Sequence, residues 1–344
     1  MRALVCHAYG PIDSLRIEDI PKPEPKAGEV LVHVRAAGVS FAAMLGVQGK
    51  HQNKPPLPYV PGNELAGHVV ALGEGVTNVA VGDRIATGVS QGAFAEYAVA
   101  TAANLIPIPE RMPYAEATNF PTLYPTAYGA LKWKAALQPD EVLLVHGAGG
   151  GSGLTAIEVG KAMGAVVIAS AGGFDKLKAA RDAGADHLID YRSEDLRTRV
   201  LELTGGRGAD VIYDPVGGSA FEASLRCIAP EGRPIPMGFA SGSIPQIPAN
   251  ILLVKNVTVI GFYYGYWNGW GGPGSKGGAP TPKEAAALAR RRAMVADAQK
   301  ELTRWFTEGK LKATVAATYD LGDWVRAFRL IEERTVVGKA VLVP

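Results

Sequence analysis

A glycine-rich turn is the part of this sequence whose residue types and spacing most clearly suggest chemistry. The stretch VHGAGGGSG, residues 145–153, follows the apolar run Val142–Val145 and contains Gly147, Gly150 and Gly153. A strand, a tight glycine turn and a following helix together present free backbone N–H groups and the positive end of the helix dipole. The main chain can then approach a diphosphate closely, so the stretch predicts a dinucleotide-binding turn.

The end of the second predicted strand should distinguish NAD(H) from NADP(H). An NAD site usually has an acidic residue about 20 residues beyond the turn, where it binds the ribose hydroxyls. Residues 168–176 read IASAGGFDK, with no acid at the strand end, while Ser170 and Lys176 offer a hydroxyl and a cation suited to a 2′-phosphate. We therefore expect NADP(H), and a solvated helix position is the alternative role of Lys176.

The elements that must position this turn are predicted from alternating patterns. Short β-branched runs alternate with helical patterns from about residue 139 onward. The predicted strands are Val142–Val145, Ala165–Ala169, His187–Ile189, Ala209–Tyr213, Arg233–Met237 and Val257–Ile260, and the predicted helices are Gly153–Met163, Asp175–Ala183, Glu194–Leu203 and Ala220–Ile228. Wholly apolar strands joined by single helices indicate an α/β domain with a doubly wound parallel sheet. This context favours a dinucleotide site over a flexible glycine loop.

The regions on either side of this domain have a different texture. Residues 1 to about 110 are rich in Gly and Pro and carry short alternating runs such as Val30–Val34 and Phe94–Val99, which predicts a mostly-β region. The terminal run Lys339–Val343 reads as a strand that could rejoin that region's sheet.

An aromatic stretch that gives way to a glycine-rich one follows Ile260, and we expect a mobile loop there. Thr281, Pro282 and Glu284 then form a capping box with Pro at the first helical position, so a long helix should begin at this point. Its apolar stripe is Leu288, Val295, Leu302 and Phe306.

Composition excludes several classes of protein. A chain of 344 residues exceeds the usual limit for one hydrophobic core, so two domains are expected. The net charge is only +2, which gives no pull toward nucleic acid or acidic membranes, and Arg290–Arg292 is expected to be a solvated helix face. Two cysteines far apart, and neither a signal sequence nor a long apolar run, point to a cytoplasmic protein that does not span a membrane.

Several longer stretches, in this order, resemble the medium-chain dehydrogenase/reductase superfamily. They are PPLPYVPGNELAGHVVALGEGVTNVAVGDRI, FPTLYPTAYGAL, VLLVHGAGGGSG, GADHLIDYRSEDL, VIYDPVGG and VVGKAVLVP. Within the superfamily the sequence most resembles the zinc-independent quinone oxidoreductase branch, related to zeta-crystallin. The resemblance implies a GroES-like mostly-β catalytic domain, whose N-terminal part is residues 1–122, and a Rossmann NADP-binding domain at 123–260. Residues 261–344 would complete the catalytic domain, with an atypical Gly/aromatic insertion at about 265–282.

The resemblance also implies chemistry without a metal. Zinc-dependent relatives hold the metal with a Cys and a His in elements that here read Gly38-Val39-Ser40 and Gly62-Asn63-Glu64, and the two cysteines cannot form a structural zinc lobe. Without a Lewis acid to stabilise an alkoxide, the expected reaction is hydride delivery to an acceptor that is already electrophilic. Quinones and conjugated enones or aldehydes are such small-molecule acceptors.

Family positions carried over one by one suggest cofactor contacts, with ordinary packing as the alternative at each. The pyrophosphate turn would comprise Gly147, Gly150, Gly151, Ser152 and Gly153, and the 2′-phosphate group Ser170, Lys176 and Tyr191. Residues expected near the nicotinamide or elsewhere along the cofactor are Thr126, Met237, Gly238, Phe239, Phe262, Tyr263 and Lys339.

The sequence departs from the family pattern at two places. The usual Asn and Asp of a G-V-N-x-x-D element are Ser40 and Ala43 here, so substrate contacts are expected to differ. We take Ser40, Tyr59 and Tyr263 as the candidate catalytic residues around the substrate pocket. The usual serine pair before the lysine is Gly172-Gly173, which implies weaker 2′-phosphate binding.

Alternatives remain open at this stage. An enoyl-thioester reductase is one, with Arg290–Arg292 as its basic patch, and a NADPH-binding protein with little catalysis is another, suggested by the missing polar pair. The aromatic cluster Phe262, Tyr263, Tyr264, Tyr266, Trp267 and Trp270 either fills the core or closes over a flat acceptor. The apolar run Val257–Ile260 predicts a homodimer paired through this edge strand of the Rossmann sheet, because an open edge would favour aggregation.

Overall fold

The computed structural model describes residues 1–52, 54–268 and 281–344, which form two compact units. Unit 1 comprises Met1–Thr122 and Ala313–Pro344, and unit 2 comprises Leu123–Lys312. The described residues 261–268 and 281–312 therefore belong to unit 2, whereas we expected residues 261–344 to complete the catalytic domain. The reason is packing: the long helix α10, Pro282–Thr307, packs against α3, Leu123–Tyr128, within unit 2.

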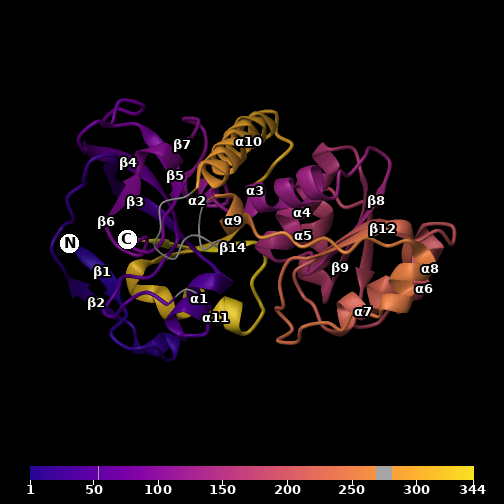
Figure 1. Ribbon diagram of the computed structural model, residues 1–344. Helices are drawn as coiled ribbons and strands as arrows, with labels where there is room; N and C mark the ends of the chain where they lie inside the picture. Colours follow the sequence, from indigo (N-terminus) through magenta and orange to yellow (C-terminus); the bar gives the residue numbers. More distant parts are fainter. Residues whose placement is uncertain (53, 269–280) are drawn as a thin grey trace. The chain divides into compact units, whose positions relative to one another are not determined.

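Unit 1 is built on a seven-stranded sheet. Its strands run in the order β13-β14-β3-β4-β5-β7, and β6 pairs with β3. Their bounds are β3 Glu29–Val39, β4 Glu64–Leu72, β5 Arg84–Gly88, β6 Tyr97–Thr101, β7 Ile106–Pro107, β13 Val315–Asp320 and β14 Lys339–Val343. The terminal strand β14 pairs antiparallel with β3, as predicted, and Figure 1 shows it in yellow among the purple strands.

Smaller elements complete unit 1. A two-stranded antiparallel sheet pairs β1, Arg2–Val5, with β2, Arg16–Asp19. The helices are α1 Phe41–Val47, α2 Tyr114–Ala117 and α11 Trp324–Glu332, with short 3-10 turns η1 Ile12–Ser14, η2 Ala102–Asn104 and η4 Leu321–Asp323. The core of the unit lies between the large sheet and these elements, and includes Phe94 and Phe328, whose rings meet edge to face at 5.9 Å.

Unit 2 contains the predicted doubly wound parallel sheet, in the order β10-β9-β8-β11-β12. The strands are β8 Val142–His146, β9 Val166–Ala171, β10 His187–Asp190, β11 Ala209–Asp214 and β12 Ile228–Pro236. The connecting helices are α4 Gly151–Ala162, α5 Phe174–Asp182, α6 Leu196–Leu203 and α7 Ser219–Arg226, followed by α8 Ala249–Lys255 and α9 Tyr264–Trp267; a π-helical turn, η3 Gly129–Lys134, extends α3. This is the Rossmann strand order, which places a crevice between β8 and β11.

The predicted strand Val257–Ile260 forms only part of a ladder with β12, and two prolines explain why. The segment does lie beside β12, because the N–H of Thr258 donates to the carbonyl of Gly232 (3.1 Å) and that of Ile260 to Pro234 (3.0 Å). A parallel ladder also needs return bonds from alternate N–H groups of β12. Those positions are Pro234 and Pro236, which have no N–H, so only half of the ladder forms.

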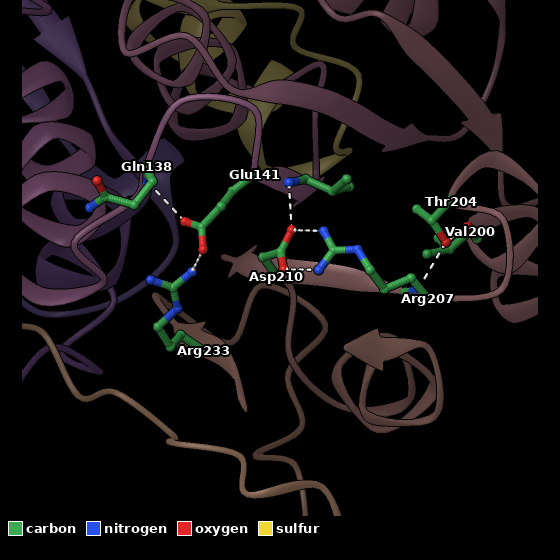
Figure 2. Close-up of polar contacts among 9 residues, drawn as sticks. Gln138, Glu141, Val200, Thr204, Arg207, Asp210 and Arg233 are labelled. Atoms are coloured by element: carbon green, nitrogen blue, oxygen red, sulfur yellow. Dashed lines mark hydrogen bonds and ion pairs between the residues drawn. The ribbon is translucent and has the colours of Figure 1, made fainter. Parts of the chain in front are cut away.

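Two carboxylates fix the end of the sheet opposite the glycine turn, as Figure 2 shows. Asp210 accepts from the N–H of Val142 (2.7 Å) and from both terminal nitrogens of Arg207 (2.5 Å each). Glu141 accepts from the N–H of Gln138 (2.8 Å) and pairs with Arg233. These contacts join the start of β8 to β11 and β12. They fix the register of the three strands at the end of the sheet opposite the glycine turn.

Candidate functional site

The glycine turn lies between β8 and α4, as the sequence predicts. Gly147 has φ +57°, a conformation that favours glycine, and the N–H of Gly150 donates to its carbonyl (3.0 Å). A Cβ at Gly153 would overlap the Gly147 carbonyl and lie 2.7 Å from Ala148 Cα. The N-cap residue of α4 is Gly150, which has no side chain to accept a hydrogen bond from the first turn of the helix. The N–H groups of Gly151 and Ser152 are therefore left to form a main-chain cradle suited to phosphate.

His146, the last residue of β8, directly precedes this turn and anchors it to α7. Its Nε2 lies 2.6 Å from Ser224 Oγ, and that hydroxyl donates its own hydrogen to the carbonyl of Ala220 (2.7 Å). The imidazole must therefore donate from Nε2 to the Ser224 oxygen. Burial lowers the pKa of His146, and the opposing effect of the Asp214 carboxylate is smaller. His146 is thus a neutral imidazole beneath the diphosphate cradle.

The loop after β11 closes the other side of the crevice. Asp214 is fully buried, and its carboxylate accepts from the N–H groups of Val216 (2.7 Å) and Gly217 (3.1 Å). This loop reaches the glycine turn, because a Cβ at Gly147 would lie 3.3 Å from both Pro215 and Val216. The loops after β8 and β11 therefore meet where the strand order reverses, the usual place for a dinucleotide.

Ser152, in the first turn of α4, has a buried partner. Its hydroxyl lies 3.0 Å from the hydroxyl of Tyr213, a residue of β11 with no exposed surface. Burial raises the pKa of Tyr213 to about 12, so the phenol stays protonated at neutral pH. This contact ties the first turn of α4 to β11.

The residues predicted to bind the 2′-phosphate lie around the end of β9, but Ser170 is buried. Its carbonyl accepts from the N–H of Ala148 (3.2 Å), so it supports the glycine turn through its main chain. Lys176, on the first turn of α5, packs its stem against Gly149, where a Cβ would lie 2.5 Å from Lys176 Cβ. The exposed Tyr191 places its hydroxyl 2.7 Å from the Cβ position of Gly172.

Arg192, which was not among the predicted cofactor-binding residues, also lies at this strand end. Its Nε is 2.7 Å from the Cβ position of Gly172, and its Nη1 is 2.9 Å from that of Gly173. Its position directly after Tyr191 was the only available signal. Nothing in the local sequence indicated that its side chain would cross to the glycine pair after β9.

The residues predicted near the nicotinamide fall into two groups in unit 2. Met237, Gly238 and Phe239 lie over the loop after β11, since the N–H of Met237 donates to the carbonyl of Asp214 (2.7 Å) and Phe239 lies 3.0 Å from the Cβ position of Gly217. Thr126 lies on α3. Gly129, one turn later, has Phe262 2.6 Å from its Cβ position.

The described members of the aromatic cluster pack within unit 2. Trp267 stacks on Trp133, with ring centroids 4.7 Å apart and an interplanar angle of 18°, and Phe262 lies 6.0 Å from Trp267. Tyr264 is buried, whereas Tyr263 and Tyr266 are exposed. Trp270 and the glycine-rich loop predicted to be mobile lie outside the described residues. For Trp267, stacking on Trp133 favours the core-filling role, because one face of the indole is occupied.

In unit 1, the Ser40 hydroxyl caps a helix. It accepts from the N–H of Ala43 (3.1 Å) at the start of α1, and Ala43 is buried. Tyr59 lies in the core of the unit beside Cys6, with its hydroxyl 3.5 Å from the Cβ position of Gly46. Burial raises the pKa of Tyr59.

Lys339, predicted near the cofactor, is buried within unit 1. Its Nζ pairs with the Glu64 carboxylate and donates to the carbonyl of Thr118 (2.7 Å). Both charged side chains are less than 5% exposed. A Cβ at Gly38 would overlap Lys339 and lie 2.9 Å from Glu64 Oε2, so this glycine makes room for the ion pair.

The described part of the chain contains no group of three or more His, Cys, Asp or Glu residues placed to hold a metal ion. None of its helices has the length and apolar character needed to cross a membrane.

Comparison with known proteins places the chain in a family. Residues 26–110 match the family described as alcohol dehydrogenase GroES-like domain, and residues 151–272 match the one described as zinc-binding dehydrogenase. Quinone oxidoreductase-like protein 2 homolog of Nematostella vectensis is 37% identical over 99% of this chain and 88% of its own length. Synaptic vesicle membrane protein VAT-1 homolog of Rattus norvegicus is 28% identical over 100% of this chain and 84% of its own length.

A solved structure extends the likeness to the whole fold. Escherichia coli quinone oxidoreductase complexed with NADPH is 29% identical, with each chain covered completely and a TM-score of 0.86. The GroES-like and Rossmann parts both fit the two units described above. The chain therefore belongs to the medium-chain dehydrogenase/reductase superfamily, in its zinc-independent quinone oxidoreductase branch.

Proposed function

We propose that this chain is an NADPH-dependent oxidoreductase that transfers hydride, without a metal, to quinones or to conjugated enones and aldehydes. The observation that carries the proposal is the glycine turn at the start of α4, where the absence of a side chain at Gly153 lets the helix pack directly on the Gly147 carbonyl and leaves the first-turn N–H groups for a diphosphate. The likeness to an NADPH-complexed quinone oxidoreductase supports the same cofactor. Ser40 and Asn63 at the positions of zinc ligands support metal-free chemistry.

Different segments of unit 2 would bind different parts of the cofactor. The first-turn N–H groups of α4 would bind the diphosphate, and the groups around the end of β9 the adenosine phosphate. When bound, NADPH supplies the hydride. The segment Met237–Phe239, over the loop after β11, would orient the nicotinamide half.

A second candidate is a NADPH-binding protein with little catalysis. The structure offers a specific reason: the Ser40 hydroxyl is engaged as a helix cap, and the position that carries a family carboxylate is the buried, apolar Ala43. The similarity to a protein named for synaptic vesicles rather than for an activity is compatible with this candidate.

Stopped-flow oxidation of NADPH distinguishes the candidates. The acceptors are 9,10-phenanthrenequinone, 1,4-benzoquinone and crotonyl-CoA. The proposed reductase oxidises NADPH rapidly with at least one quinone and slowly with the thioester. Preference for crotonyl-CoA would indicate an enoyl-thioester reductase instead. Tight NADPH binding with no turnover on any acceptor would favour the second candidate.

A homodimer is also proposed. The N–H of Val259, between the two residues that donate to β12, lies on the other side of the segment Val257–Ile260, and the neighbouring helix α8 exposes Leu253 and Val254 at about four-fifths of their surface. A second copy paired along this edge would cover both features.

A further inference from the structure

Two consecutive glycines follow β9, and an arginine side chain occupies the space that they leave. Gly172 and Gly173 separate β9 from α5, and Gly173 has φ +92° as the N-cap of that helix. A Cβ on Gly172 would lie 2.7 Å from Arg192 Nε, and one on Gly173 would lie 2.9 Å from Arg192 Nη1. The guanidinium therefore spans both glycines, and any side chain there would displace it.

The backbone holds Arg192 in this place. Strand β10 pairs in parallel with β9, with Asp190 opposite Ala171, and Arg192 follows two residues later. The Asp190 carboxylate accepts from the N–H of Arg192 (3.0 Å) and from the N–H of Gly173 (3.3 Å). One carboxylate thus ties the two segments together and fixes the starting point of the arginine side chain.

The guanidinium is available to an anion. Arg192 is exposed, and across residues 1–52, 54–268 and 281–344 its guanidinium has neither a hydrogen-bond nor an ion-pair partner. Lys176 adds a second cation at the same end of the sheet, while Asp190 is engaged with two N–H groups and Asp175 is exposed on α5. A planar guanidinium with parallel N–H donors matches a phosphate in a bidentate way.

The end of the second strand is where dinucleotide sites distinguish a 2′-phosphate from a 2′-hydroxyl. Resting on the proposed NADPH function, we propose that Arg192 determines the preference for the 2′-phosphate, and that Gly172 and Gly173 serve to seat its guanidinium. Serines at these positions would bind phosphate through short hydroxyls. In this chain the glycine pair replaces them with a longer, charged donor that comes from the neighbouring strand.

The test compares the dissociation constants of NADPH and NADH by calorimetry in Arg192→Met. A charged hydrogen bond lost from a phosphate corresponds to about a 10- to 100-fold weaker NADPH complex. NADH affinity should stay within about twofold, because NADH carries no 2′-phosphate. Arg192→Lys keeps the positive charge but loses the two parallel N–H donors of the guanidinium. Its NADPH affinity should therefore lie between those of the unmodified protein and Arg192→Met. The matched control is Arg197→Met, an exposed arginine on α6 that lines a separate groove beside α7.

A second variant, Gly172→Ser, tests the role of the glycines, because the added hydroxyl alone would be expected to strengthen phosphate binding. Gly172→Ser adds a phosphate-binding hydroxyl, yet it should weaken NADPH relative to NADH because it displaces Arg192 and the Tyr191 hydroxyl. Stronger NADPH binding in Gly172→Ser would overturn the inference. So would equal effects of Arg192→Met on both coenzymes, or no effect on either. If the unmodified protein binds neither coenzyme, the proposed function itself fails.

Discussion

The buried His146 predicts a defined loss of stability in mild acid. Its Nε2–H donates to Ser224 Oγ, and burial lowers its pKa, so the folded protein holds this imidazole neutral. In the unfolded chain a histidine titrates near pH 6.5, at about its ordinary value. Below that pH the imidazole is protonated in the unfolded state but stays neutral in the folded state. The free energy of unfolding therefore falls as the pH falls.

The size of the effect follows from linkage. For one histidine that stays neutral when folded, the loss between pH 7.5 and 5.5 is about 1.4 kcal/mol. His146→Gln keeps an N–H donor for Ser224 but cannot titrate. Its free energy of unfolding should therefore fall by about 1.4 kcal/mol less than that of the unmodified protein over the same interval.

The assay is urea unfolding followed by circular dichroism at pH 7.5, 6.5 and 5.5. Ser224→Ala serves as the control: it removes the acceptor and should lower stability by about 1–3 kcal/mol at every pH, with the pH dependence intact. The reasoning is refuted if the curves for His146→Gln and the unmodified protein stay parallel from pH 7.5 to 5.5.

Three other predictions concern the turn, the ion pair and assembly. Gly153→Ala should weaken NADPH at least about tenfold by calorimetry, because its Cβ overlaps the Gly147 carbonyl, while Gly261→Ala, with nothing within 4 Å of its Cβ, should bind normally. Lys339→Met leaves the buried Glu64 carboxylate without its partner, so it should lower the free energy of unfolding in urea by about 3–5 kcal/mol. Adding Glu64→Gln to this variant should restore most of that stability, and failure to do so would argue against a buried ion pair. Sedimentation at micromolar concentration should give twice the chain mass of 36.1 kDa, and a single-chain mass would contradict the proposed dimer.

The sheet of unit 2 was predictable because its signals are local. Strands β8 to β11 and helices α4 to α7 lie where the alternating patterns place them, with ends that differ by at most two residues. The capping box at Thr281 was equally readable, since the hydroxyl accepts from the N–H of Glu284 and the Glu284 carboxylate accepts from the N–H of Thr281. Each of these features depends on residues close together in the chain.

The parts that the sequence did not reveal depend on neighbours in space. Pro234 and Pro236 leave Val257–Ile260 with half a ladder, and that requires knowing which side of β12 each proline faces. Arg192 reaches the glycines after β9 only because β10 lies beside that strand. Lys339 meets Glu64 from the far end of the chain. The roles suggested for Ser40, Tyr59 and Tyr263 in catalysis stay predictions.

Calorimetric titration of the full chain with NADPH and with NADH tests the central claim most directly. The glycine cradle at α4 predicts one NADPH bound per chain, with NADPH tighter than NADH because of the cations at the end of β9. No heat and no thermal shift with either coenzyme would contradict the account.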